Sequence, residues 1–107
     1  MSIIKNLTPH VVNICDENNN IIRVIESEGI ARCQATITTT GAIDGIPLSS
    51  TIFGAVCDLP KEEDGVFFIV SRLVMSASPN RKDLLVPNEL VRDESNNIIG
   101  CKSLSNN

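Results

Sequence analysis

Aromatic residues are scarce in this sequence, which has three Phe and neither Trp nor Tyr. Proteins that bind single-stranded nucleic acid usually stack the bases on aromatic side chains, so this class is disfavoured. Basic residues are also few, with nine Lys and Arg against 13 Asp and Glu and a net charge of −4. A surface that binds duplex nucleic acid carries clustered positive charge. We therefore expect no duplex nucleic acid among the partners.

Long apolar runs are absent as well. The longest, residues 66–70, has the length of a strand, whereas a membrane-spanning helix needs about 20 apolar residues. The first residues lack the charged segment and the apolar core of a signal peptide. These features predict a cytoplasmic protein without a membrane partner.

The sequence offers little for metal binding. It has one His and four Cys, and no two Cys form a C-x-x-C pair. The spacing of Cys15, Cys33, Cys57 and Cys101 fits no zinc-site pattern. All four lie in apolar segments, which is typical of buried free thiols that act as small hydrophobic side chains. We expect neither a metal nor another cofactor.

Polar turn sequences recur about every ten residues along the 107-residue chain, which has the length of one domain (1–107). They lie at 16–20, 28–29, 44–45, 61–65 and 94–97. The segments between them are rich in Ile, Val and Thr, at 10–15, 21–25, 35–40, 50–57 and 66–70. Short β-rich segments between such turns are typical of antiparallel strands. Residues 91–93 and 98–101 flank an Asn-rich turn and predict a C-terminal hairpin.

One segment favours a helix. Residues 71–77 are compatible with helix, Ser71 is a suitable N-cap, and Ser78-Pro79-Asn80 is a suitable stop. The sequence therefore predicts an α+β fold, consisting mainly of an antiparallel sheet of short strands, with one short helix at about 71–78 and a C-terminal hairpin.

The segment Asn6-Leu7-Thr8-Pro9-His10 precedes the first predicted strand. Pro9 fixes its own φ and favours an extended Thr8, so the segment is a rigid entry to that strand. Asn6, Thr8 and His10 either satisfy local backbone groups or line a polar pocket. Catalysis by His10 would need a partner such as a Cys, and no Cys has the sequence context of a known catalytic nucleophile.

Charge is unevenly distributed along the chain. Residues 1–71 have four basic and nine acidic side chains, whereas residues 72–107 have five basic and four acidic ones. Arg72, Arg81 and Arg92 are therefore the natural candidates for a phosphate site, because a guanidinium offers a bidentate fork. Ser71, at the predicted start of the helix, either caps it or also contacts an anion. No P-loop sequence is present, which excludes the P-loop nucleoside-triphosphatase class.

The segment 79–87 contains two prolines that bracket a polar turn and a short apolar run. Arg81 and Asp83 are two residues apart, so on an extended chain their side chains share a face. They either brace the loop, or Arg81 contacts a ligand while Asp83 orients it. Asn80 would supply a further polar contact.

Four patterns together resemble a family of small proteins found in bacteriophages and some bacterial genomes. They are Asn6-Leu7-Thr8-Pro9-His10, Phe68-Ile69-Val70-Ser71, Pro79-Asn80-Arg81-Lys82-Asp83-Leu84 with Pro87, and Val91-Arg92-Asp93 with Ile98-Ile99-Gly100-Cys101. The resemblance covers nearly the whole chain, and residues 16–62 are its least specific part. The family often has Gly before the last pattern, where this chain has Asn97, a residue that also tolerates positive φ.

Through its phage association, the family resembles viral anti-defence nucleotide sponges of the anti-CBASS and anti-Thoeris type. This resemblance implies a non-enzymatic immune-evasion protein of the infected bacterial cytoplasm. It would sequester a cyclic dinucleotide or a cyclic ADP-ribose derivative, and would be a homo-oligomer, a dimer or tetramer. The ligand-binding residues expected for that function are Asn6, Thr8, His10, Phe68, Ser71, Arg72, Asn80, Arg81, Asp83 and Arg92.

Two other functions compete with this interpretation. The first is a phage structural or host-interaction module without a small ligand, which would use exposed strand edges. The second is a small enzyme that pairs His10 with Cys15, Cys57 or Cys101. The apolar setting of these thiols disfavours the enzyme, because burial raises thiol pKa values.

Overall fold

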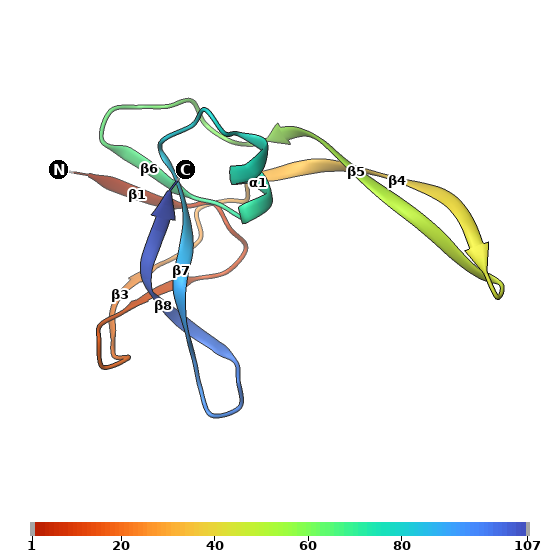
Figure 1. Ribbon diagram of the computed structural model, residues 1–107. Coiled ribbons are helices and arrows are strands. Elements are labelled where there is room, and N and C mark those ends of the chain that lie inside the picture. Colours follow the sequence, from red (N-terminus) through yellow and green to blue (C-terminus); the bar gives the residue numbers. More distant parts are fainter. Residues whose placement is uncertain (1, 107) are drawn as a thin grey trace.

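The computed structural model describes residues 2–106, which form eight strands and one helix (Figure 1). In chain order the elements are β1 (Ile3–Asn6), β2 (Val12–Cys15), β3 (Ile21–Ile25), β4 (Arg32–Ile43), β5 (Ile46–Cys57), β6 (Val66–Ile69), α1 (Arg72–Ala77), β7 (Leu84–Arg92) and β8 (Ile98–Asn106). No helix among these residues is long and apolar enough to cross a membrane.

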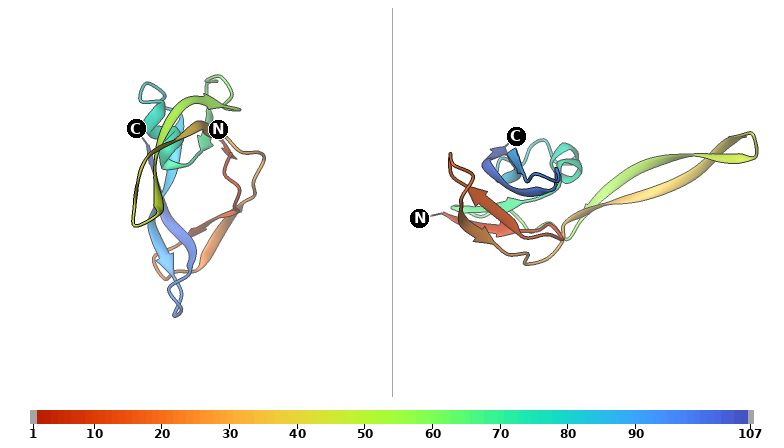
Figure 2. Two further views of the ribbon diagram at one scale, coloured as in Figure 1. Left: turned by 90° about the vertical axis from the view of Figure 1, so that its right-hand side faces the viewer. Right: turned by 90° about the horizontal axis from the view of Figure 1, so that it is seen from below.

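Six strands form one mixed sheet in the order β1-β6-β7-β8-β2-β3. The β1–β6, β6–β7 and β2–β8 pairs are parallel, and the β2–β3 and β7–β8 pairs are antiparallel. The two ends of the sheet meet at a bridge between Asn6 and Ser27, where the amide of Glu28 donates to the Asn6 carbonyl over 2.8 Å. The sheet therefore curls into a partly closed barrel (Figure 2).

The α+β class predicted from the sequence is confirmed, as are the short helix and the C-terminal hairpin. The N-cap is Ser71 and the C-cap is Ser78. In the turn between β7 and β8, positive φ falls on Asn96, at 66°, one residue before the expected Asn97. Strand β1 and the three parallel pairings were not predicted, because their partners lie far apart in the sequence.

Strand β6 is buried on both of its faces. Val66 and Phe68 belong to a core cluster that includes Val74 and Met75 of α1. Ile69, pointing the other way, belongs to a second cluster with Val12, Ile25 and Cys101. The helix thus covers one face of the sheet, and the curl of β2, β3 and β8 encloses the other.

Strands β4 and β5 pair only with each other and project from the body as an arm (Figures 1 and 2). The arm is longer than the predicted strands 35–40 and 50–57. It turns at Asp44 and Gly45, which both have positive φ, at 52° and 77°, as a tight hairpin turn requires. The radius of gyration is 16.9 Å, against about 13 Å for a compact chain of this length.

Candidate functional site

A groove of about 1020 Å³ opens between the start of α1 and the strands β2, β7 and β8. We call it the central groove. It is lined by residues 8–13, 70–72 and 98–101, together with Ile21, Val86, Pro87 and Leu90. Four of the predicted ligand-binding residues lie in this lining, namely Thr8, His10, Ser71 and Arg72. The groove therefore brings together two sequence patterns that are about 60 residues apart.

Asn6 holds the loop that forms one rim of the central groove. Its side chain is fully buried, and its Nδ2 donates to the carbonyl oxygens of His10 (2.7 Å) and Ile25 (3.0 Å). Its Oδ1 accepts from the backbone amide of Thr8 (3.0 Å) and lies 2.6 Å from the Thr8 hydroxyl. With its donors and acceptor engaged, Asn6 positions the loop and ties it to the end of β3. It does not line the groove.

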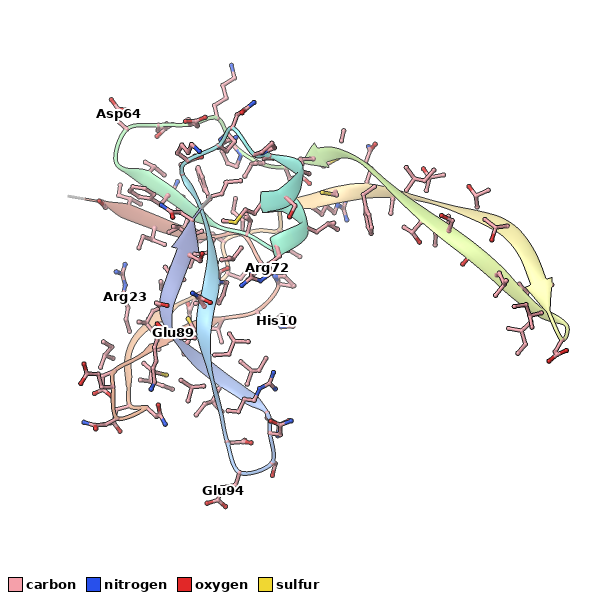
Figure 3. The ribbon with its side chains drawn as sticks, viewed as in Figure 1. His10, Arg23, Asp64, Arg72, Glu89 and Glu94 are labelled. Carbon is pink, nitrogen blue, oxygen red and sulfur yellow. The ribbon has the colours of Figure 1, made fainter. Side chains whose placement is uncertain are left out.

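Arg72 and His10 are exposed and lie near each other at the groove, below α1 (Figure 3). Within residues 2–106, neither side chain has a hydrogen-bond or ion-pair partner. None of the described residues that line the groove is acidic. With Arg72 in its lining and no carboxylate among the described lining residues, the groove favours an anion over a cation, although the chain has a net charge of −4.

Ser71 serves as the cap of α1. Its Oγ accepts from the amide of Val74 over 3.2 Å. The helix has only six residues and begins at Arg72, directly after this cap. The cap therefore fixes the start of the helix, and with it the position of Arg72 at the groove. The capping role predicted for Ser71 is confirmed.

The floor of the central groove depends on a close approach of β2 and β8 that sequence reasoning missed. The Asn13 side chain donates to the carbonyl of Ile99 over 3.1 Å. A Cβ on Gly100 would lie 2.6 Å from the Cys15 Sγ and 2.8 Å from the Asn13 carbonyl oxygen. The signals in the sequence are a polar residue inside an apolar strand, at Asn13, and a glycine inside a strand, at Gly100.

The cysteines are all free thiols, with Cys15 and Cys101 buried. Cys101 also lines the central groove. Burial is the main cause that raises the pKa of the Cys101 thiol above its ordinary value. A raised pKa keeps it protonated at neutral pH and lowers its reactivity.

The other predicted ligand-binding residues lie outside the groove lining. Phe68 is buried in the core cluster under α1. Asn80 is exposed in the turn after α1. Arg92 is exposed at the end of β7 and donates to the Asn96 carbonyl over 3.0 Å.

Arg81 and Asp83 form a brace away from the groove. The guanidinium meets the Asp83 carboxylate through two hydrogen bonds, of 2.9 Å from Nε and 2.8 Å from Nη2. Nη2 also donates to the Pro60 carbonyl over 2.8 Å, and the Glu62 carboxylate lies 3.4 Å from Nε. The brace ties the loop before β6 to the loop before β7. The Arg81 hydrogen bonds are the main cause that lowers the pKa of the Asp83 carboxyl.

Arg81→Gln is expected to destabilise the protein by about 2 kcal/mol at neutral pH, because it leaves the nearly buried Asp83 carboxylate without its ion pair. Since the folded-state pKa of Asp83 is lowered, the brace contributes fully above the unfolded-state pKa, near 3.9. Its contribution is lost as the pH falls through the lower folded-state pKa. The difference in free energy of unfolding between the wild type and the Arg81→Gln variant should therefore shrink toward zero in acid. Urea unfolding at several pH values would measure it.

Arg92→Gln is the matched control for this brace. The exposed guanidinium of Arg92 makes one hydrogen bond, to a carbonyl in a turn, so this substitution should lower the free energy of unfolding by less than about 1 kcal/mol at every pH. If Arg81→Gln lowers the free energy of unfolding by the same amount from neutral pH down to strong acid, the ion pair does not contribute to stability.

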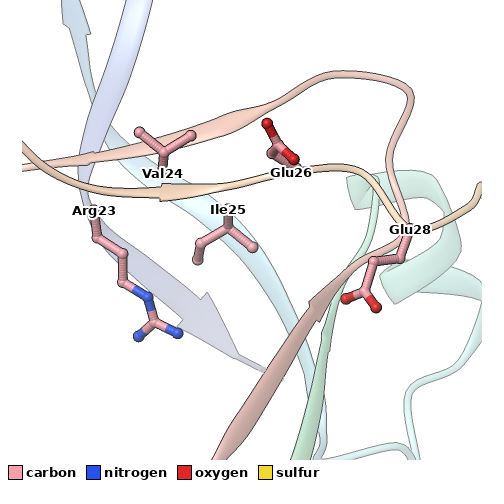
Figure 4. Close-up of a pocket in the computed structure, with 5 residues that line it drawn as sticks. All are labelled: Arg23, Val24, Ile25, Glu26 and Glu28. Atoms are coloured by element: carbon pink, nitrogen blue, oxygen red, sulfur yellow. The ribbon is translucent and has the colours of Figure 1, made fainter.

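A second, smaller depression of about 400 Å³ lies along β3 (Figure 4). Its lining contains Arg23 but also the carboxylates of Glu26 and Glu28. Because two acidic side chains and one basic side chain line this depression, its charge disfavours the binding of an anion. The central groove is the better candidate site.

Comparisons of the chain with family models, curated proteins and solved structures found no significant match. Among residues 2–106, no group of three or more His, Cys, Asp or Glu side chains is placed to hold a metal ion.

Proposed function

We propose that the central groove binds a small anionic nucleotide, of the cyclic dinucleotide or cyclic ADP-ribose type. The observation that carries this proposal is the Arg72 guanidinium, which has no partner within residues 2–106 and lies in a groove whose described lining contains no carboxylate. A guanidinium is well suited to a phosphate. The volume of about 1020 Å³ is at the upper end of ligand sites, which span roughly 300–1,000 Å³.

The apolar walls suit the bases of such a ligand. Val86, Pro87 and Leu90 form one wall, and Ile98 and Ile99 continue it on β8. Because the described lining contains no aromatic residue, a base would pack on these aliphatic side chains or on the flat face of the Arg72 guanidinium. The hydroxyl of Thr8 and the imidazole of His10 would supply polar contacts at the rim.

We propose further that the ligand is sequestered and not hydrolysed. The described lining of the groove contains no carboxylate, and its imidazole, His10, has no hydrogen-bond partner within residues 2–106 to orient it as a general base. The thiol in the lining, Cys101, is buried with a raised pKa. Together with the phage resemblance, this supports a viral immune-evasion protein that removes a defence messenger in the cytoplasm of the infected bacterium. The ligand released by heating should be recovered unchanged, as mass spectrometry would measure.

Arg72→Gln is expected to weaken nucleotide binding by about tenfold or more, because a hydrogen bond to a charged phosphate is lost. Arg72 is exposed and has no hydrogen-bond or ion-pair partner within residues 2–106, so the melting temperature without ligand should not change. Calorimetric titration of both proteins with cyclic dinucleotides and cyclic ADP-ribose would measure the effect.

Arg23→Gln is the control for that titration, because Arg23 lies at the smaller depression along β3. It should bind the nucleotide like the wild type. No binding of any nucleotide in the panel by the wild-type protein would contradict the proposed function.

The projecting arm favours a second candidate, an interaction module of phage structural or host-takeover type that needs no small ligand. The same titration separates the two functions. Binding in the groove that depends on Arg72 supports sequestration, and its absence leaves the arm as the functional surface.

A further inference from the structure

The β4–β5 arm is almost without charge. Of residues 33–56, only Asp44, at the tip, is charged. Six large apolar side chains of the arm are exposed: Ile37, Ile43, Ile46, Leu48, Ile52 and Phe53. Exposed apolar surface of this extent normally marks an interaction site.

The strand register places most of these side chains on one face. Along β5, Ile46, Leu48 and Ile52 are separated by even numbers of residues and so point the same way. Ile43 lies directly opposite Ile46 across the hairpin and shares that face. We call this set the apolar arm face. It runs from the tip of the arm for most of its length.

The strand edges of the arm are unprotected. Among residues 2–106, each of these strands pairs along one side only, so each leaves a row of backbone groups unpaired on its outer side. Soluble proteins usually protect such edges with charged residues or proline. Here Pro47 is the only such residue between positions 33 and 56 besides Asp44. The edges are open to strand addition.

The arm gives the chain more surface than a compact monomer has. The accessible surface is 7400 Å², whereas a monomer of 11.6 kDa exposes about 5,800 Å². The excess of about 1,600 Å² exceeds the roughly 800 Å² per partner that a standard interface buries. A two-stranded ribbon alone is only marginally stable in water, so covering the arm would also stabilise it.

We propose that the arm is the surface through which the protein binds a second copy of its own chain. The apolar arm face and an open strand edge would form the interface. The lack of charge disfavours nucleic acid or a strongly charged protein as the partner, because neither would meet complementary charge. An uncharged apolar face is complementary to an identical face, as a two-fold interface requires.

The test is the molar mass of the full-length protein in solution, measured by light scattering across the micromolar range. The wild type should have at least twice the monomer mass of 11.6 kDa. Leu48→Lys combined with Ile52→Lys places two charges on the apolar arm face and should shift the mass to that of the monomer. Both side chains are exposed, so the spectrum of the body in two-dimensional NMR should keep its folded dispersion.

Ile22→Lys combined with Val24→Lys is the matched control. These residues are as exposed as Ile52 but lie on β3, at the edge of the barrel. This variant should keep the mass of the wild type. A monomeric wild type overturns the proposal, whether or not a host protein is found on the arm. So does an arm variant that keeps the oligomer mass, or dissociation caused by the β3 variant alone.

Discussion

Gly100→Ala is expected to destabilise the protein by about 3 kcal/mol or more, through overpacking at the point where β2 and β8 meet. The added Cβ would lie 2.6 Å from the Cys15 Sγ and 2.8 Å from the Asn13 carbonyl oxygen. One of these neighbours is backbone, and the thiol is buried, so neither has room to retreat. The strands must separate, and they pair at a single register position, Ile14 with Cys101.

Gly54→Ala is the matched control for this substitution. Gly54 also lies in a strand, β5, but its nearest neighbour would be the Gln34 Cβ, at an ordinary 3.9 Å. Urea unfolding should show little change for Gly54→Ala, or a slight gain from reduced freedom of the unfolded chain. Equal stability of the Gly100→Ala protein and the wild type would show that β2 and β8 lie too far apart for a Cβ on Gly100 to meet the Cys15 Sγ at 2.6 Å.

The sequence signals that predicted the fold correctly are local ones. Ser71 and Ser78 marked the ends of α1, and the Asn-rich turn marked the β7–β8 hairpin. Parallel pairs such as Ile3 with Val66 have no such signal, because about 60 residues separate the partners. The barrel closure depends on contacts between segments about 20 residues apart, namely the bridge between Asn6 and Ser27 and the hydrogen bonds around it.

The arm could not be predicted for a different reason. Apolar residues such as Ile37 and Ile52 in a β-rich segment normally indicate a buried strand face, yet they are 70% and 63% exposed. The sequence pattern shows that a side chain is apolar, but it does not show whether another part of the protein covers that side chain. Within residues 2–106, no other element covers these two side chains.

The candidate site was predicted in part. Thr8, His10, Ser71 and Arg72 meet at the central groove. Arg81, chosen for its guanidinium, is engaged by Asp83, only two residues away. The sequence allowed both roles for Arg81, and the geometry of the loop favours the brace.

Asn6→Ala is expected to cost about 4 kcal/mol, because it removes the fully buried side chain that holds the Thr8–His10 loop. The carbonyl of Ile25 and the amide of Thr8 lose their side-chain partner, and each buried polar group left unpaired costs roughly 1–3 kcal/mol. Such a loss is a large part of a typical stability of about 5–15 kcal/mol. Asn18→Ala, in an exposed turn, is the control and should unfold at the same urea concentration as the wild type.

Asn6→Asp separates the hydrogen bonds of this side chain from its packing. The introduced carboxyl fills the same space and keeps the acceptor for Thr8, but its second oxygen faces the carbonyl oxygens of His10 and Ile25, where Nδ2 donated over 2.7 and 3.0 Å. Burial and these carbonyl groups raise the folded-state pKa of the introduced carboxyl above its unfolded value, near 3.9. The variant should therefore be least stable above that folded-state pKa. As the pH falls, the carboxyl is protonated and regains a donor, so the stability of the variant should approach that of the wild type.

Urea unfolding at several pH values would measure the effect. A loss of stability that does not change with pH would instead show that Asn6 acts through its shape alone. Recovery in acid would show that donation from this side chain to the carbonyl groups of the loop and β3 holds the rim of the groove.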